Sequence, residues 1–417
     1  MEKYYWLPVY GICGECNEPG IGYKWCQPCN AKRFKDNFKN WTSGNKIVDE
    51  FIQQSQLNAV HYKKCLEWIP FEKFQNITYI TEGGFDCKYA LKSLKNSSKI
   101  SSDFLNEIKS YLQIYLVDII QCYGITQDPN TREYMMVLEY CDSGNLRNYL
   151  NISEDYIDYG KKVDQLKQIA RGLLDIHNAG KVHKDFHSGN ILFIGEPYIS
   201  DLGMCQPANK KQTVKEEGIY GVLPFIAPEV LRGHQYTKAA DIYSFGIMMN
   251  EFLSEEIPFN DIPHDEFLAI KICKGLRPKI SEDIPKLLAD LMIKCRDAEI
   301  KNRPATKELY QLLNKWNSEA YDGKCEIYFQ TKECDKIGEK KFYNRSNESK
   351  SKSIQIHPQA IYTSRLLNVK NLPKPVNSTD LLSIQINSAN PISECLDVQL
   401  SELELNEIYQ DKGSNIE

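Results

Sequence analysis

Two aspartates and one asparagine are spaced along the chain in a way that could allow a reaction at a hydroxyl group. Asp185 lies five positions before Asn190, and Asp201 lies eleven positions after Asn190. A carboxylate within hydrogen-bond reach of a hydroxyl can take up its proton. A carboxylate and an amide oxygen together are ligands that suit Mg²⁺ beside phosphate groups. An acid five residues before an amide is common by chance, so this interpretation depends on the residues around it.

Five motifs follow one another along the chain, and the first of them contains Asp185. They are His-Lys-Asp at 183–185, Asp-Leu-Gly at 201–203, Ala-Pro-Glu at 227–229, Asp-Ile-Tyr-Ser-Phe-Gly at 241–246 and Arg-Pro at 303–304. In this order they resemble the catalytic half of a protein kinase domain, and the tyrosine-kinase-like group in particular. The resemblance covers residues 71–316 and implies an α+β fold with a small β-rich N-lobe and a helical C-lobe. It also implies that Arg303 pairs with Glu229.

The resemblance assigns a role to each of five residues. Asp185 would be the catalytic base, and Asn190 and Asp201 would hold Mg²⁺. Lys92 follows Tyr-Ala-Leu, and Glu107 lies 15 residues later. In an active kinase such a lysine and glutamate form the ion pair that holds the α- and β-phosphates of ATP. The cofactors expected from this resemblance are therefore ATP and Mg²⁺.

Two further segments would meet the nucleotide. By position, Leu138 would be the gatekeeper residue at the back of the adenine site. Glu139 to Cys141 would form the hinge that contacts adenine. Gly83 and Gly84 would belong to the glycine-rich loop that covers the phosphates.

This glycine-rich loop departs from the family pattern in composition and in length. Thr81 and Asp86 occupy the places of the first and third glycines, and only six residues separate Phe85 from Lys92. Those six must finish the loop, form one strand, turn and begin the next strand. A strand usually takes five or six residues and a tight turn takes two. The normal hairpin cannot fit, so we expect lower ATP affinity and turnover.

Three explanations of the short segment remain open. The chain could be a pseudokinase that has lost the hairpin. An exon could be missing from this sequence, so that the functional protein has the hairpin. Alternatively the sheet could be re-registered, with residues 77–85 running directly into residues 88–93.

The hydroxyl acceptor is only partly indicated by the catalytic loop. Ser/Thr kinases commonly carry lysine two residues after the catalytic acid and tyrosine kinases carry alanine, whereas this chain has His187. The Gly-Thr that often precedes Ala-Pro-Glu in Ser/Thr kinases reads Gly221-Val222 here. The resemblance favours Ser/Thr over Tyr as the acceptor.

A separate motif near the start of the chain has the spacing of a metal site. Cys13, Cys16, Cys26 and Cys29 form two C-x₂-C pairs separated by nine residues. Two such pairs can supply four thiolates to one tetrahedral Zn²⁺, which leaves no open position and makes the site structural. A redox C-x-x-C motif and two disulfides are the alternatives, and an intracellular setting disfavours the disulfides. The better functional interpretation of this module is docking to another protein, because acidic residues dilute its basic ones.

The surrounding elements divide the chain into four parts. Residues 1–30 would be a Cys₄ zinc-ribbon-like module, and residues 31–70 a helical linker packed on or near the N-lobe. In the kinase domain, residues 88–92 and 134–140 read as strands and residues 163–177 as an amphipathic helix. Residues 317–417 are polar and of low complexity, so we expect a mostly disordered tail. Within this tail, Leu396, Leu400 and Leu403 could lie on one face of a short partner-binding helix.

Composition restricts the class of protein. The 417 residues carry a net charge of −5, which gives no general basic field for nucleic acid. No apolar run of about 18 residues and no secretory signal are evident, so a cytoplasmic protein is expected. The sequence therefore predicts a kinase in intracellular signalling that acts on protein substrates and has signalling partners. The alternatives are a pseudokinase scaffold that binds partners through the C-lobe and Cys₄ module, and a zinc-knuckle adaptor for nucleic acid.

Overall fold

The computed structural model describes residues 11–20, 25–75, 77, 88–93, 100–114, 117–208, 218–348 and 356–377. Residues 1–375 belong to one unit and residues 376–417 to another. Gly83 and Gly84 lie outside the described residues, as do Thr81, Phe85 and Asp86. The helix expected around Leu396 to Leu403 also lies outside them.

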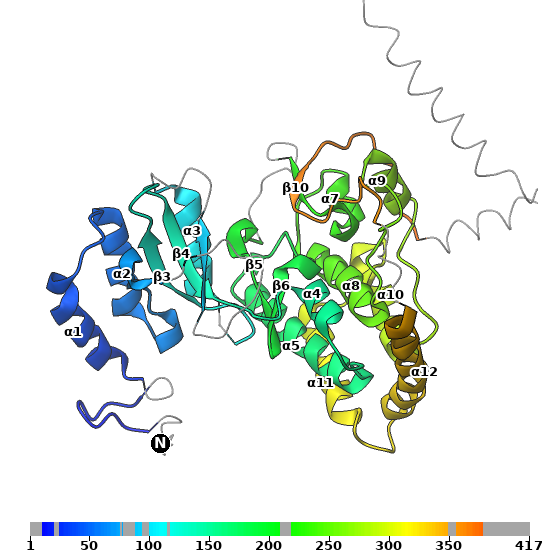
Figure 1. Ribbon diagram of the computed structural model, residues 1–417, viewed down its shortest axis with the longest axis horizontal. Helices are drawn as coiled ribbons and strands as arrows, with labels where there is room; N and C mark the ends of the chain where they lie inside the picture. Colours follow the sequence, from blue (N-terminus) through cyan, green and yellow to red (C-terminus); the bar gives the residue numbers. More distant parts are fainter. Residues whose placement is uncertain are drawn as a thin grey trace, which may run out of the picture. The chain divides into compact units, whose positions relative to one another are not determined.

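A four-stranded sheet forms the core of the N-lobe (Figure 1). Its strands, in spatial order, are β1 (Glu67–Trp68), β3 (Cys122–Gln127), β4 (Tyr134–Glu139) and β2 (Tyr89–Ser93). β1 runs parallel to β3, and the other neighbours are antiparallel. Helix α3 (Ser102–Gln113) begins at Ser101, whose side chain accepts a hydrogen bond from the backbone N–H of Phe104. Phe104, Ile108 and Tyr111 of this helix are fully buried.

Strand β2 occupies an edge of this sheet within the described part of the chain. It pairs with β4 over Tyr89 to Ser93, in agreement with the strand expected at residues 88–92. Because β2 already begins at Tyr89, only residues 86–88 lie between Phe85 and this strand. Another strand of ordinary length and a turn need more residues than these three. This agrees with the argument that the usual hairpin does not fit.

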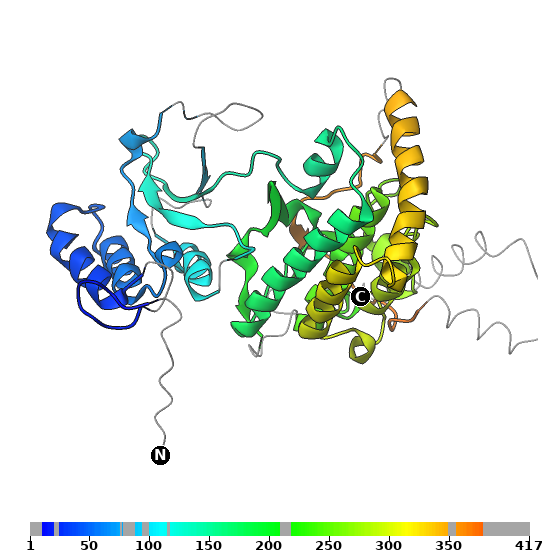
Figure 2. The ribbon, with the colours of Figure 1, turned by 90° about the horizontal axis from the view of Figure 1, so that it is seen from below.

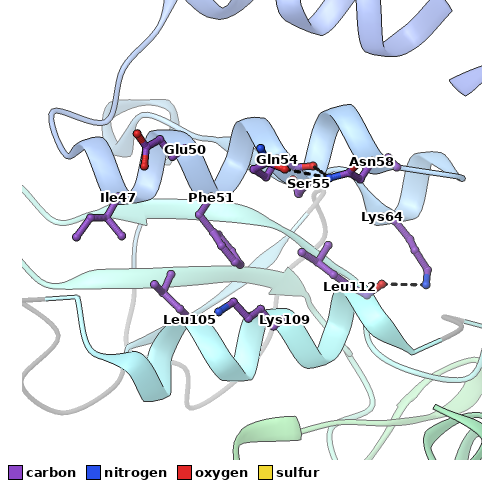
Figure 3. A pocket seen from close by; sticks show the side chains of 11 residues that line it. Ile47, Glu50, Phe51, Gln54, Ser55, Asn58, Lys64, Leu105, Lys109 and Leu112 are labelled. Atoms are coloured by element: carbon purple, nitrogen blue, oxygen red, sulfur yellow. Dashed lines mark hydrogen bonds between the residues drawn. The ribbon is translucent and has the colours of Figure 1, made fainter. Parts of the chain in front are cut away.

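Two helices precede the sheet. α1 (Gln27–Asn37) begins at the second cysteine pair, and α2 (Lys46–Asn58) packs on α1 and toward α3. Val48 and Ile52 of α2 are completely buried. The side chain of Phe51 on α2 points toward that of Leu105 on α3 in a pocket between the two helices (Figure 3). Lys64 closes one end of this pocket, because its Nζ donates to the carbonyl oxygen of Leu112 at 2.9 Å. α2 thus faces α3, which carries Glu107, across this pocket.

The C-lobe is mainly helical (Figures 1 and 2). Its helices are α4 (Leu146–Ile152), α5 (Tyr159–Asn178), α7 (Pro228–Leu231), α8 (Lys238–Ser254), α9 (Glu266–Cys273), α10 (Lys286–Cys295), α11 (Thr306–Glu319) and α12 (Glu326–Glu348). The fold class expected from the sequence is confirmed. The amphipathic helix expected at residues 163–177 is the inner part of α5. α8 is buried at every position from Ala240 to Ser254 and is the central helix of the lobe.

Short strand pairs and 3₁₀ turns connect the helices of the C-lobe. The pairs are β5 (Lys181–Val182) with β8 (Gln206–Pro207), β6 (Ile191–Ile194) with β7 (Glu196–Ile199), and β9 (Ile219–Gly221) with β10 (Arg365–Leu367). The 3₁₀ turns of the chain are η1 (Phe38–Asn40), η2 (Tyr62–Lys64), η3 (Phe71–Lys73), η4 (Ser188–Asn190), η5 (Leu202–Met204), η6 (Leu223–Phe225) and η7 (Ile300–Asn302). Arg303 donates two hydrogen bonds of 2.7 Å to the carboxylate of Glu229, and both side chains are buried. This is the pair that the sequence motifs predicted.

The segment after residue 316 corrects one expectation. Assignment of residues 317–417 to a mostly disordered tail is wrong for 317–348 and 356–377, which form the end of α11, α12, β10 and the chain around these elements. α12 packs on α5 and α11, and Figure 2 shows it as a long helix beside them. Asp335 accepts hydrogen bonds from the backbone N–H of Tyr159 and the hydroxyl of Tyr156. The sequence is misleading because only one narrow edge of α12 is buried, so its composition remains polar.

Replacement of Ile327 by alanine tests whether α12 is part of the folded C-lobe. Ile327 is 1% exposed, so Ile327→Ala should lower the free energy of unfolding by about 2–4 kcal/mol through lost burial and a cavity. The measurement is the midpoint of urea-induced unfolding. Ile337→Ala on the same helix is the control, because Ile337 is 44% exposed. Equal small effects of both variants would contradict the packing described here.

Candidate active site

The loop between β5 and β6, residues 183–190, is held by the buried carboxylate of Asp241 on α8. Asp241 accepts hydrogen bonds from the backbone N–H of His183 at 2.8 Å and of Lys184 at 3.1 Å. The His183 side chain is fully buried. Its Nε2 lies 3.1 Å from the carbonyl oxygen of Ser200, and its Nδ1 accepts from the N–H of Asp185. Burial lowers the pKa of His183, which keeps the ring neutral and able to make both contacts. The backbone of Asp185 is therefore fixed from two sides.

The carboxylate of Asp185 is nearly buried but faces polar groups. The Ser364 hydroxyl lies 2.7 Å from its Oδ1 and 2.6 Å from its Oδ2, and His187 Nε2 lies 3.6 Å from Oδ1. Burial alone would raise the pKa of Asp185. The hydrogen bond and charge of His187 and the hydrogen bond from Ser364 outweigh it, so this pKa lies below its usual value. Asp185 is thus an ionised hydrogen-bond acceptor near neutral pH.

Asn190 is tied to both acids of the motif. Its Nδ2 donates to the backbone carbonyl of Asp185 at 2.8 Å. The backbone carbonyl oxygen of Asn190 accepts hydrogen bonds from the backbone N–H and from the hydroxyl of Ser200, the residue before Asp201. The side-chain hydrogen bond uses the amide nitrogen, so the amide oxygen is the atom that can bind a cation.

Lys92 joins the N-lobe to the C-lobe. Its Nζ lies 2.8 Å from Glu107 Oε1 on α3 and 2.8 Å from Asp201 Oδ1 at the start of η5. Asp201 adopts a left-handed backbone conformation with φ of 54°, and its carboxylate accepts from the N–H of Gly203. The structure therefore brings together three residues that the sequence placed in one site.

Charge and burial compete within this cluster. Burial would lower the pKa of Lys92, but the charges of Glu107 and Asp201 outweigh it and raise that pKa. Burial raises the pKa of Glu107 by more than Lys92 lowers it. Burial would also raise the pKa of Asp201, but the charge and hydrogen bond of Lys92 hold it below the usual value. The charged forms of Lys92 and Asp201 are therefore favoured, whereas burial disfavours the charged form of Glu107.

The residues expected at the adenine lie at the end of β4. Leu138 is 9% exposed and is paired across the sheet with Ala90 of β2 and Cys122 of β3. The N–H of Glu139 donates to the carbonyl of Gln121. Cys141 is buried, and burial together with Glu139 and Asp142 raises the pKa of its thiol to about 12. This cysteine is therefore a packing residue with an unreactive thiol.

Ser364 is the residue of this site that the sequence reasoning missed. It lies more than 170 positions after Asp185, in a region assigned to the tail. The only local signal is a group of four apolar or aromatic residues, at 361, 362, 366 and 367, on either side of Thr363, Ser364 and Arg365. Such a group can mark a short strand, but it does not indicate which strand it joins.

The four cysteines converge near the start of α1. Their Sγ atoms all lie within 4.8 Å of one another. The Cys13–Cys29 and Cys16–Cys26 sulfur distances are 3.8 and 3.5 Å. A tetrahedral Zn²⁺ with Zn–S bonds of about 2.3 Å requires sulfurs about 3.8 Å apart. The donor set and its spacing therefore fit one Zn²⁺ with four thiolate ligands.

Comparison with known proteins decides the family. The model of the protein tyrosine and serine/threonine kinase family matches residues 64–313, which is more than half of the chain. The chain belongs to this kinase family.

Three relatives show how far the likeness extends. The kinase is 29% identical to the serine/threonine-protein kinase pakC of Dictyostelium discoideum over 259 residues, which cover 58% of this chain and 53% of pakC. It is 26% identical to the serine/threonine/tyrosine-protein kinase HT1 of Arabidopsis thaliana over 227 residues, covering 54% and 58% of the two chains. Identity to the Raf homolog serine/threonine-protein kinase of Caenorhabditis elegans is 27% over 226 residues, covering 50% and 27%. The matched segments thus span little more than half of these relatives at most.

These relatives confirm the resemblance to tyrosine-kinase-like protein kinases. The match to the family model covers residues 64–313, and the cysteine cluster lies before this range. Among the described residues of this kinase, no helix is both long and apolar enough to cross a membrane.

Replacement of Lys92 by methionine tests the ionic link between the lobes. Lys92→Met leaves two carboxylates together without their cation, which should cost on the order of 3 kcal/mol in unfolding free energy at neutral pH. Burial already raises the pKa of Glu107 in the folded protein and Lys92 opposes this rise, so loss of Lys92 should raise that pKa further. Glu107 of the folded variant then takes up a proton at low pH, which stabilises the folded state. The loss of unfolding free energy caused by Lys92→Met should therefore be smaller at pH 5 than at pH 7.5.

The readout is urea unfolding of both proteins at pH 5 and at pH 7.5. Lys109→Met on the exposed face of α3 is the matched control and should behave like the wild type at both values. If Lys92→Met lowers the unfolding free energy by the same amount at both pH values, the buried Glu107 is not the cause of the loss.

Proposed function

We propose that this chain is an ATP-dependent protein kinase that transfers the γ-phosphoryl group to Ser/Thr hydroxyls of proteins in intracellular signalling. The observation that carries the proposal is the cluster of Lys92, Glu107 and Asp201, with both Nζ–O distances at 2.8 Å. In protein kinases the Lys–Glu pair and the metal-holding aspartate must both be in place for phosphoryl transfer.

The residues of the site fit ATP and Mg²⁺ by their chemistry. Asn190 offers an amide oxygen and Asp201 an ionised carboxylate, which are hard oxygen ligands of the kind that Mg²⁺ prefers. Mg²⁺, when bound there, would neutralise charge on the phosphates. Lys92 would hold the α- and β-phosphates. Leu138, with Glu139 to Cys141, would line the adenine site.

Asp185 would orient the acceptor hydroxyl and receive its proton. A lowered pKa keeps this carboxylate ionised, and a hydroxyl already lies within 2.7 Å of it. That hydroxyl belongs to Ser364, and the next residue, Arg365, pairs with Gly221 of β9. A tyrosine is longer and would need its backbone farther from β9. The arrangement supports Ser/Thr acceptors over Tyr acceptors.

A second candidate function is a pseudokinase scaffold that binds partner proteins through the C-lobe and the Cys₄ module. The edge position of β2 in the described sheet and the three residues between Phe85 and Tyr89 favour it. Gly83 and Gly84 would provide little cover for phosphates in so short a segment. We therefore expect activity below that of a kinase with a complete glycine-rich loop.

The Cys₄ module is proposed to hold a structural Zn²⁺ and to present a protein-docking surface. Asn17, with φ of 57°, turns the chain directly after Cys16, and a backbone bridge between Ile12 and Pro19 closes the loop that holds the first cysteine pair. Trp25 Nε1 donates to the carbonyl oxygen of Ala59 after α2 at 2.9 Å. This contact joins the module to the end of α2. The Zn²⁺ is therefore proposed to be structural, whereas docking to a partner protein would use the surface of the module.

Loss of the Asp201 carboxylate separates the two candidate functions. Asp201→Asn should reduce phosphoryl transfer from Mg·ATP at least about 100-fold, since it removes the charge that holds the metal. The measurement is label transferred from γ-labelled ATP to dephosphorylated casein, with the exposed Asp155→Asn as control. A wild type no more active than Asp201→Asn would favour the scaffold.

Metal analysis tests the cysteine site. The purified chain should carry about one zinc per molecule, and Cys16→Ser should lose most of it because one of four ligands is replaced. Cys325→Ser, which changes a cysteine outside the cluster, is the control and should keep its zinc. Elemental mass spectrometry after growth in zinc-containing medium gives the ratio. Less than a tenth of an equivalent in the wild type would refute the zinc assignment.

A further inference from the structure

Residues 356–372, here called the docked segment, lie along the C-lobe next to the catalytic loop. Its strand β10 pairs antiparallel with β9, with Arg365 opposite Gly221, Leu366 opposite Tyr220 and Leu367 opposite Ile219. Figure 1 shows β10 beside α7, which follows β9 in the chain. Addition of a strand to an exposed edge is a general way in which proteins bind extended peptides. The docked segment is thus bound as a peptide would be.

His264, which lies between α8 and α9, anchors the docked segment by three contacts. Its backbone N–H donates to the carbonyl of Gln359 at 2.9 Å, and its ring Nδ1 lies 2.9 Å from the carbonyl oxygen of Ile361. Its own carbonyl accepts from the guanidinium of Arg365 at 2.6 Å. The path of the chain on both sides of Ser364 is therefore fixed by hydrogen bonds.

Tyr362 provides the side-chain anchor. Its hydroxyl donates to the carbonyl of Pro258 at 2.7 Å, and the guanidinium of Arg147 lies 4.1 Å from the centre of its ring. Arg147 is itself paired with the buried Glu251. The His264 ring packs edge-on against Tyr362 at 4.7 Å. Tyr362 thus occupies a prepared site, two residues before Ser364.

These anchors deliver one hydroxyl to the catalytic acid. Ser364 Oγ lies 2.7 and 2.6 Å from the two oxygens of Asp185, and His187 Nε2 lies 3.2 Å from the same Oγ. The preceding Thr363 is exposed. The arrangement distinguishes Ser364 from its hydroxyl-bearing neighbour.

We propose that the docked segment is an intramolecular substrate and that Ser364 is a phosphorylation site modified by this chain's own Asp185. The proposal rests on the kinase function proposed above. In the step, Ser364 Oγ forms a bond to the γ-phosphorus of ATP while the bond from that phosphorus to the β,γ-bridging oxygen breaks. Asp185 takes the hydroxyl proton, ADP leaves with the bonding electron pair, and the products are phosphoserine 364 and ADP.

Phosphorylation at this position would also release the segment. A phosphoserine carries a charge of about −1.5 to −2 at neutral pH and would face the ionised carboxylate of Asp185. Like charges at hydrogen-bond distance repel, so the modified segment leaves its place beside β9 and Asp185. Until then the docked segment occupies the strand position that an added protein substrate needs. The chain should therefore phosphorylate other proteins only after a lag.

The first experiment follows Ser364 in the full-length, phosphatase-treated chain after addition of Mg·ATP. Mass spectrometry should locate phosphate on Ser364, with a rate constant that does not change over a tenfold range of chain concentration. A tagged Asp185→Asn chain mixed with the wild type should remain unlabelled at Ser364. Labelling of that chain at the wild-type rate would overturn the intramolecular assignment.

Dephosphorylated casein in the same reaction separates this inference from the proposed function. Label on casein with none on Ser364 would overturn the inference and leave the kinase function standing. Label on neither would refute the kinase function, and with it the self-phosphorylation. Label on both, with a lag only for casein, is the expected result.

Variants of the strand test the geometry itself. Leu367 is partly buried against the core, whereas the neighbouring Leu366 is 65% exposed. Leu367→Asn should slow Ser364 labelling at least tenfold and shorten the casein lag, because the buried amide weakens docking. Tyr362→Ala should do the same through loss of its site, and Leu366→Asn should leave both rates unchanged. Wild-type rates in both Leu367→Asn and Tyr362→Ala would overturn the proposal.

Discussion

The shared ion pair of Lys92 is the interaction on which the rest of the site depends. This side chain extends from β2 to Glu107 on α3 and Asp201 of the C-lobe, at 2.8 Å in each case. Two carboxylates in a partly buried space repel unless a cation lies between them. Lys92 therefore holds α3, β2 and the loop that carries Asp201 in one arrangement. Helix α2, which packs on α1 and on β1, faces α3 across the pocket lined by Phe51 and Leu105.

The C-lobe contributes rigidity of another kind. Asp241 accepts hydrogen bonds from two consecutive N–H groups of the catalytic loop, and the buried Arg303–Glu229 pair ties the region after β9 to the segment before α11. A buried ion pair contributes little net stability, but removal of one partner is costly. These polar contacts fix Asp185 and β9 relative to each other. An edge strand in such a position can receive a peptide, and in this chain the peptide is its own residues 356–372.

The sequence predicted much of the site because its motifs are local and their roles follow from charge. The strand at 88–92, the helix at 163–177, the Glu229–Arg303 pair and the cysteine cluster were all expected, and the structure describes each of them. The ordered part of the tail was missed for a physical reason. α12 buries only a narrow edge, and β10 is a three-residue strand stabilised by its partner β9. Neither carries enough hydrophobic surface of its own to be recognised.

By itself, the sequence determined the kinase fold, the identity of the acids and the lysine, and the shortage of residues before Lys92. These follow from residue type and spacing, which the chain carries locally. Only the tertiary structure decided what lies against Asp185, since Ser364 and Asp185 are far apart in sequence and meet through the pairing of β9 with β10. Backbone hydrogen bonds between strands have no sequence signature of their own. Their partners are selected by the shape and charge of the whole fold.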